Sequence, residues 1–383
     1  MTARLASLAN IQELAEQIAG APVVALDTEF HAERRYIPRL YLVQLKPAGQ
    51  DTWLVDPLVA GLLEAIARPL AEADWIVHGG SRDLTIMYQV LGALPRRVWD
   101  TQIAAGLVAG VYPGRFSHLT ERWIGHKPDK AETLTNWSRR PLTPEQQSYA
   151  AQDAELLHPL WTALWDEAGQ LGRQDLVRAA CADAVEAALD PPPDDTTWRR
   201  VPGLPSLTRQ QAAVLQELAA WREERAREGN QPTFSIASNA ILIGLARSQP
   251  STAEELRRNR RLPRGLANRF GTELIERIQR SAARPEWAWP RFVTPSTSNF
   301  RRLSWLSCFA ECDAAQHNYA PRLGLPVELR EDLVLDPPAD PEALVAKIGG
   351  WRSALLGDRL LPALHGSVLL QMGDEVRIHH RSV

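Results

Sequence analysis

The sequence predicts an α/β domain with a mixed sheet flanked by helices, followed by two all-α helical bundles. Three observations support this prediction. Short apolar runs separated by turn residues occupy the first 90 residues, helical periodicity dominates the rest, and proline-rich stretches divide the chain near residues 191–205 and 285–295. A chain of 383 residues is also too long for one ordinary hydrophobic core.

In the first segment, the apolar runs have the length of strands and the periodic stretches have the length of helices. The order is a short helix, three strands in a meander, a helix, a fourth strand and a further helix. The predicted ranges are helix 8–18, strands 23–26, 40–45 and 52–55, helix 58–70, strand 75–78 and helix 83–91, with helices continuing to about residue 189. Early strands with later interleaved helices indicate an α/β domain.

The second and third segments show almost no strand pattern. Predicted helices cover 207–228, 237–247, 252–257 and 265–283 in the second segment, and 304–315, 341–356 and 358–365 in the third. We therefore expect a domain at 1–190, a proline-rich linker at 191–206, and helical modules at 207–285 and 295–375.

The composition, with 45% hydrophobic and 23% charged residues, is typical of a globular protein and includes no apolar run long enough to span a bilayer. The N-terminus soon carries polar and acidic residues, which argues against a secretory signal. Three cysteines cannot form a disulfide framework. We expect a cytoplasmic protein without membrane contact, and the three-module layout is compatible with a monomer.

Charge is unevenly distributed along the chain. Residues 199–302 contain 19 arginines, no lysine and nine acidic residues, a net charge of +10, whereas residues 1–198 carry −9 and residues 303–383 carry −4. A basic module between two acidic ones suggests a polyanionic partner such as nucleic acid, and an ordinary arginine-rich solvated surface is the alternative.

Asp27 and Glu29 lie two residues apart at the end of an apolar run, so on a strand both side chains face the same side of the sheet. Two neighbouring carboxylates repel each other, and a hard cation with oxygen ligands would relieve this repulsion. For an isolated Asp-x-Glu pair, solvated acids at a strand end are the more common explanation.

Two further segments supply acids. Tyr149 and Asp153 are four residues apart on a predicted helix and share one face, while Asp83 stands near the start of another helix. Each alone could be structural, as a plain Tyr–Asp hydrogen bond or a helix cap. Together, four carboxylates predict a site for two divalent ions, Mg²⁺ or Mn²⁺, about 4 Å apart, which cleaves phosphodiesters by in-line displacement.

In this site we expect Asp27 to bridge both ions. Glu29 and Asp153 would complete the ion on the nucleophile side, and Asp83 would act on the leaving-group side. Tyr149 would orient the attacking water rather than act as a strong base.

The acidic segments resemble the ribonuclease D family of exonucleases. Asp27-Thr28-Glu29-Phe30 resembles its first motif, His78 to Leu84 its second, and Tyr149-Ala150-Ala151-Gln152-Asp153 its third. Asp100-Thr101-Gln102 and Trp137 match intervening positions, so the resemblance covers nearly all of residues 20–165. It implies a ribonuclease H-like exonuclease fold and an enzyme that removes nucleoside 5′-monophosphates from RNA 3′ ends.

The basic segment resembles the helicase-and-ribonuclease-D C-terminal (HRDC) domain, through residues 218–228 and the later Pro250, Leu256 and Gly271. An arginine cluster around a predicted turn, Arg257, Arg258, Arg260, Arg261 and Arg264, could bind phosphates. Trp221 is expected in the core rather than as a base-stacking platform. Residues 299–373 resemble a second, divergent HRDC module, which could instead pack against the first domain.

The leading hypothesis is therefore a divalent-metal-dependent 3′→5′ exoribonuclease that acts on RNA with a free 3′ end, such as a tRNA precursor. The choice of RNA comes only from the family resemblance. A DNA 3′→5′ exonuclease acting in repair and a non-catalytic nucleic-acid-binding protein built from HRDC modules are the alternatives. The intact acidic set argues against the second of these.

Overall fold

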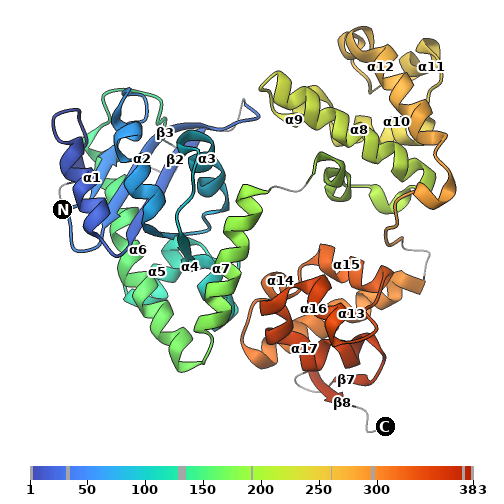
Figure 1. Cartoon of the computed structure of the whole chain (residues 1–383). Helices are drawn as coiled ribbons and strands as arrows, with labels where there is room; N and C mark the ends of the chain where they lie inside the picture. Colours follow the sequence, from blue (N-terminus) through green and yellow to red (C-terminus); the bar gives the residue numbers. More distant parts are fainter. Residues whose placement is uncertain are drawn as a thin grey trace.

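The N-terminal domain is built on a six-stranded mixed sheet (Figure 1). The computed structural model describes residues 3–31, 35–127, 135–190, 193–259, 261–294, 298–372 and 376–380. The strand order is β1-β4-β3-β2-β5-β6. The strands are β1 (Arg4–Leu5), β2 (Val24–His31), β3 (Arg39–Pro47), β4 (Trp53–Val55), β5 (Asp74–Val77) and β6 (Arg97–Asp100).

The predicted meander is present, because β2 pairs antiparallel with β3 and β3 pairs antiparallel with β4. On the other side of β2, β5 and β6 continue the sheet in parallel. The prediction that helices continue from residue 91 to about residue 189 is wrong at β6, which lies between α3 (Ser81–Leu91) and α4 (Thr101–Ala109). This strand is only four residues long and half of its residues are buried, so its pattern is weak.

Helices pack around this sheet, which confirms the predicted α/β class. They are α1 (Ile11–Gly20), α2 (Leu62–Glu72), α3 (Ser81–Leu91), α4 (Thr101–Ala109), α5 (Phe116–Ile124), α6 (Pro144–Gln170) and α7 (Gln174–Leu189). The α1 and α2 helices bury Leu14, Ile18 and Ile66 against sheet residues such as Val43 and Trp75. Within the described residues, no helix is long and apolar enough to cross a membrane.

The middle module is all-helical in its described part. It comprises η1 (Asp194–Arg200), η2 (Leu204–Ser206), α8 (Arg209–Glu228), α9 (Thr233–Ile236), α10 (Asn239–Ser248), α11 (Ala253–Arg258), α12 (Arg264–Ala282) and η3 (Glu286–Ala288). Trp221 is fully buried in its core, as predicted. Trp198, Val201 and Leu204, which lie in the predicted linker, are buried in the same cluster, so they extend the module toward its N-terminal side.

The C-terminal module contains five helices and a two-stranded ribbon among its described residues. These are α13 (Ser298–His317), α14 (Pro321–Gly324), α15 (Val327–Leu335), α16 (Pro341–Ile348), α17 (Gly350–Leu364), β7 (Val368–Met372) and β8 (Val376–His380). The single helix predicted at 341–356 is wrong, because Gly349 adopts a φ of 84° and separates α16 from α17. The α17 helix then runs on through the predicted break before residue 358.

The C-terminal module packs against the N-terminal domain, as the alternative for this module proposed. One hydrophobic cluster contains Leu107 and Leu164 of the first domain together with Phe309 and Leu355 of the last module. The Ala320 N–H donates to the Gly106 carbonyl over 2.7 Å, within the same junction. A shared core of this kind opposes separation of the two units, because separation would expose apolar surface.

The middle module contacts the N-terminal domain through the segment that joins β2 to β3. The Ile37 N–H donates to Asn230 Oδ1 over 3.0 Å, and Arg227 donates to the Tyr36 hydroxyl over 3.2 Å. Arg227 is also paired with Asp194 at 2.7 Å. The helical modules touch each other as well, through an ion pair of 2.8 Å between Arg199 and Asp332. Each of the three units therefore contacts the other two.

Candidate metal and active site

Strand β2 carries two of the predicted acids at its C-terminal half. Val24, Ala25 and Leu26 are buried because β2 lies between β3 and β5 in the sheet. Asp27 and Glu29 follow, and strand alternation directs both to one face. A bulge between Glu29 and Phe30 shifts the register of the pairing with β3, which continues to His31. The strand thus changes from a core element to a polar edge at the two acids.

Helix α6 brings the other half of the site. Thr143 caps it, accepting from the Gln146 N–H over 3.2 Å, while Gln146 Oε1 accepts from the Thr143 N–H over 2.9 Å. Ala150 and Ala154 are fully buried where the helix packs on the sheet. Tyr149 and Asp153 lie one turn apart beside these alanines, so small residues allow the helix to approach β2 closely.

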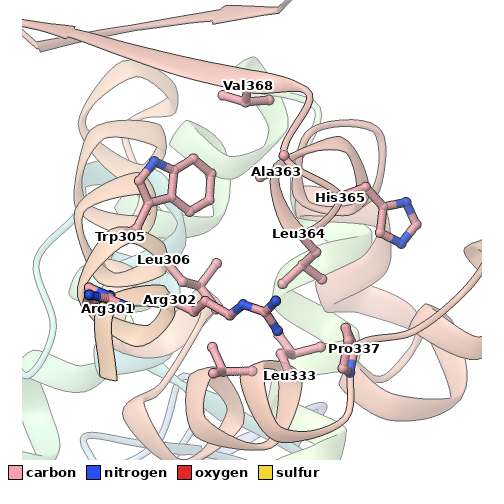
Figure 2. A pocket seen from close by; sticks show the side chains of 12 residues that line it. Arg301, Arg302, Trp305, Leu306, Leu333, Pro337, Ala363, Leu364, His365 and Val368 are labelled. Carbon is pink, nitrogen blue, oxygen red and sulfur yellow. The ribbon is translucent and has the colours of Figure 1, made fainter. Parts of the chain in front are cut away.

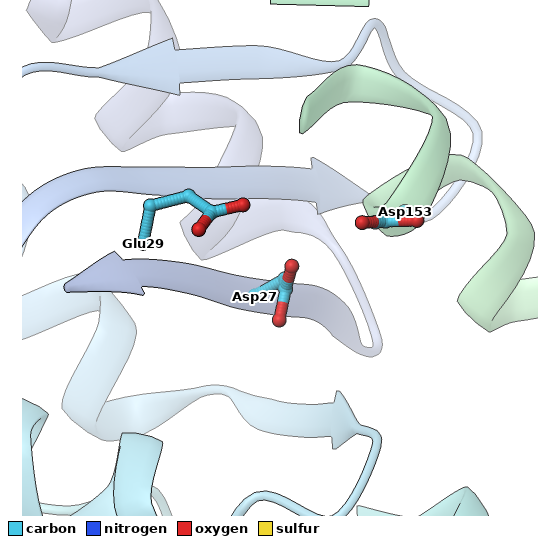
Figure 3. A group of neighbouring side chains, drawn as sticks. All are labelled: Asp27, Glu29 and Asp153. Atoms are coloured by element: carbon cyan, nitrogen blue, oxygen red, sulfur yellow. The ribbon is translucent and has the colours of Figure 1, made fainter. Parts of the chain in front are cut away.

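Three of the predicted carboxylates converge. Asp27, Glu29 and Asp153 each offer an oxygen, and these oxygens all lie within 4.8 Å of one another. Figure 3 shows the side chains of the strand and of the helix directed toward a common space. Tyr149 has a side-chain hydrogen bond with Asp153, which keeps the phenol beside the acids. Residues more than 120 positions apart in the sequence are thus brought together.

Asp83 lies next to this group rather than inside it. It stands in the first turn of α3, where its Oδ1 accepts a hydrogen bond from the Thr28 hydroxyl. The turn before α3 is fixed by Asp100, whose oxygens accept from the N–H groups of Gly79 and Gly80, each over 2.9 Å. Thr28 had no predicted role. Its position between two acids on a strand could have indicated one, because alternation directs its side chain to the other face from theirs, where it contacts α3.

The electrostatics reflect the crowding of partly buried acids. Burial, followed by repulsion from Asp153, Asp83 and Glu29, raises the pKa of Asp27 well above its ordinary value. For the same reasons the pKa of Glu29 rises to about 8. Burial raises the pKa of Asp153 to about 7 and that of Asp83 to about 6, with the Thr28 hydrogen bond opposing the latter.

The Tyr149 hydroxyl stays protonated in this environment. Burial, together with the charges of Asp153, Glu29 and Asp27, raises its pKa well above the ordinary value. A phenol of this kind is a hydrogen-bond donor at neutral pH and a poor general base. This agrees with a role in orienting a water molecule.

Gln44 is a buried neighbour of the site that the sequence did not single out for a role. It is 0% exposed, it pairs with Asp27 across β2 and β3, and cross-strand partners share one face of the sheet. Neither its amide nitrogen nor its amide oxygen has a hydrogen-bond partner among the described residues. An unpaired buried amide is costly, so this one marks a place where a polar partner is missing.

The predicted arginine cluster lies on the turn between α11 and α12 of the middle module. Arg257, Arg258, Arg261 and Arg264 are exposed there, and Arg260 lies outside the described residues. Arg258 forms an exposed ion pair of 2.7 Å with Glu254. The cluster is distant in sequence from the acids, and its contact with nucleic acid stays a prediction.

The fold and the acidic group define a class of protein, a 3′→5′ exonuclease domain joined to an HRDC domain. Residues 5–168 match the family model described as a 3′-5′ exonuclease, and residues 211–278 match the model of the HRDC domain. The HRDC match ends at residue 278, so the relation of the C-terminal module to HRDC stays a prediction.

Several relatives that match most of the chain are named ribonuclease D. Ribonuclease D of Gluconacetobacter diazotrophicus is 33% identical over 94% of this chain and 92% of its own length. Ribonuclease D of Escherichia coli K12 is 32% identical over 73% of this chain and 75% of its own. The crystal structure of Escherichia coli RNase D, described as an exoribonuclease involved in structured RNA processing, superposes with a TM-score of 0.80 at 26% identity, covering 96% of this chain and 99% of that one.

The chain belongs to the ribonuclease D family. This confirms the predicted family, the fold class and the enzyme class, a 3′→5′ exoribonuclease. The DNA exonuclease and the non-catalytic binding protein, the two alternatives from the sequence, are not favoured by these relatives.

Proposed function

We propose that this exoribonuclease shortens RNA from its 3′ end with two divalent metal ions, Mg²⁺ or Mn²⁺, held by Asp27, Glu29, Asp83 and Asp153. Tyr149 orients the attacking water. The observation that carries the proposal is the convergence of three partly buried carboxylates, whose oxygens lie within 4.8 Å of one another.

The residues fit hard cations for three reasons. All of the donors are carboxylate oxygens, which Mg²⁺ and Mn²⁺ prefer. Among the described residues, no lysine or arginine nitrogen lies within ion-pair distance of these acids to neutralise them. The unpaired Gln44 amide adds a donor that could hold an ionised Asp27 in place, as groups behind a metal ligand commonly do.

Divalent ions at such a site lower the pKa of a water molecule and stabilise charge on the phosphate and on the leaving oxygen. The protein does the positioning. Thr28 fixes the Asp83 carboxylate by its hydrogen bond, and α6 presents Asp153 and Tyr149 to the strand together. The Tyr149 hydroxyl keeps its proton and donates it in a hydrogen bond, so it aims a nucleophile without deprotonating it.

RNA with a free 3′ end is the proposed substrate, with tRNA precursors as its natural form. The support is the family, including an Escherichia coli relative described as acting in structured RNA processing. The exposed arginines of the α11–α12 turn, Arg257, Arg258, Arg261 and Arg264, with Arg260 between them in sequence, are proposed to bind phosphates of the RNA body. We further propose a cytoplasmic monomer, in keeping with three free cysteines and three mutually contacting units.

The test compares 5′-labelled RNA and DNA oligomers of equal sequence, each with Mg²⁺ or Mn²⁺. The expected result is stepwise shortening of RNA from the 3′ end with release of nucleoside 5′-monophosphates, much slower shortening of DNA, and no product in EDTA. Asp27→Asn serves as the inactive control. Internal cuts in the RNA, or no mononucleotide from the wild type, would overturn the proposal.

A further inference from the structure

The C-terminal module contains a cavity of about 640 Å³ that the proposed function does not use. It lies between α13, α15 and the end of α17, with Val368 of β7 above it (Figure 2). Its walls are mainly apolar and include Leu306, Leu333 and Leu364. This volume falls in the range of ligand pockets, roughly 300–1,000 Å³.

Two arginines and His365 are the polar side chains that line this cavity. Figure 2 shows Arg302 extending into the hollow from α13, and Arg301 stands beside it on the rim. Neither has an ion-pair or hydrogen-bond partner among the described residues, and none of the twelve lining residues is acidic. The cavity therefore presents positive charge that nothing in the described chain neutralises.

Among the described residues, three other arginines of this acidic module have acidic partners, whereas Arg301, Arg302 and the exposed Arg322 have none. Arg330 is paired with Glu311 at 3.7 Å, Arg352 with Asp183 at 3.3 Å, and Arg359 with Asp313 at 2.6 Å. Arg302 also lies in the first turns of the 20-residue helix α13, which has no acidic residue in its first turn. Positive charge at a helix N-terminus adds to the helix dipole and favours an anion there.

Trp305 supplies a flat aromatic surface one turn from Arg301 on the same helix face. One side of the indole stacks on Phe309, with ring centroids 5.8 Å apart and an angle of 15° between the planes. The ring borders the cavity in Figure 2 and stays partly exposed. An aromatic plane beside an unpaired arginine is the combination that proteins use for a stacked base and its phosphate.

We propose that this cavity binds one nucleotide of the RNA strand, with the base against Trp305 and the phosphate on Arg302. The inference rests on the proposed function, in which RNA is the substrate. An RNA strand offers both the flat base and the anionic phosphate that these side chains fit. It assigns to the acidic C-terminal module a local contact with RNA, although the net charge of the module disfavours nucleic acid.

The experiment measures the affinity of the full chain for a single-stranded RNA of about 20 nucleotides by fluorescence anisotropy in EDTA. Trp305→Leu, which keeps apolar volume but removes the stacking surface, should raise Kd about tenfold, and Trp305→Phe should stay within about twofold of the wild type. Arg302→Gln should raise Kd by a similar factor and lower the slope of log Kd against log salt by about one. Arg322→Gln, an exposed arginine of the same module outside the cavity, is the matched control.

Crosslinking gives an independent readout. RNA with 4-thiouridine should form photo-crosslinks that mass spectrometry maps to residues 301–306. If Trp305→Leu lowers the melting temperature, Arg302→Gln still decides the matter, because its side chain is exposed. The inference is overturned if Arg302→Gln binds RNA as the wild type does and no crosslink reaches α13.

Failure of this inference can be told apart from failure of the proposed function. Mononucleotide release from a trinucleotide held at the acidic site should be the same in the wild type and in the Trp305 and Arg302 variants. Absence of release from the wild type would count against the metal-dependent activity, whatever the anisotropy shows.

Discussion

Replacing Glu29 with glutamine should stabilise the metal-free protein in a pH-dependent way. The pKa of this carboxyl rises from 4.5 to about 8 through burial and repulsion from Asp153 and Asp83. Such a displacement corresponds to roughly 5 kcal/mol against the ionised form in the folded state. Because the neighbouring acids share protons, removing one carboxylate should recover less, about 2–3 kcal/mol.

The sign follows from proton counting. Between about pH 4.5 and pH 8, folded Glu29 keeps a proton that the unfolded chain has released, so the free energy of unfolding falls as pH rises through this window. Glutamine has no proton to lose, and the variant should lose stability less steeply. The gain should therefore be absent near pH 4.5 and complete above pH 8.

Thermal melting in EDTA measures the effect. Near pH 8.5 we expect Glu29→Gln to melt about 5 °C above the wild type, and near pH 4.5 we expect equal midpoints. Adding Mn²⁺ should raise the midpoint of the wild type more than that of the variant, because binding stabilises only the folded form that can bind. Glu16→Gln, at an exposed position on α1, is the matched control. A variant no more stable than the wild type at high pH would refute the reasoning.

Four further outcomes are expected. Asp27→Asn should lower turnover by several orders of magnitude with RNA affinity nearly unchanged, as single-turnover cleavage and anisotropy would record. Gln44→Leu should weaken Mn²⁺ binding about tenfold in calorimetry while leaving the melting temperature equal or higher, because it removes an unpaired buried amide. Arg257→Glu with Arg261→Glu should weaken RNA binding and lower its salt slope by about two, with unchanged trinucleotide cleavage. Gly106→Val should weaken the contact between the C-terminal module and the N-terminal domain, because a Cβ there would lie 2.9 Å from a methyl carbon of Leu323. Faster hydrogen exchange in α13 would show this, and exchange at the wild-type rate would contradict it.

Much of the site could be predicted because its chemistry is local in sequence. The alternation of β2 and the capping box of α6 fix on which face Asp27, Glu29 and Asp153 point before any tertiary contact is known. What brings the two elements together is the packing of small residues such as Ala150 against the sheet. The approach of α6 to β2 was predicted from the resemblance to the family and not from the periodicity of the sequence.

The missed features depend on contacts between distant segments. Gln44 fits the spacing of the ribonuclease D family behind the first motif, but no role for it followed from the sequence, and only its burial without a partner suggests one. The strands β1 and β6 are too short to show a pattern, and they form because β4 and β5 offer them an edge. The helix break at Gly349 depends on the positive φ of this residue. A glycine alone does not predict such a break, because Gly357 lies inside the continuous helix α17.

The most direct test is a Mn²⁺ titration of the full chain followed by electron paramagnetic resonance, in the wild type and in Asp27→Asn. If the converging acids form a two-metal site, the wild type should bind two Mn²⁺ per chain, and the variant should lose at least one of them along with mononucleotide release. Equal Mn²⁺ binding by both proteins would contradict the assignment of these carboxylates as the metal ligands.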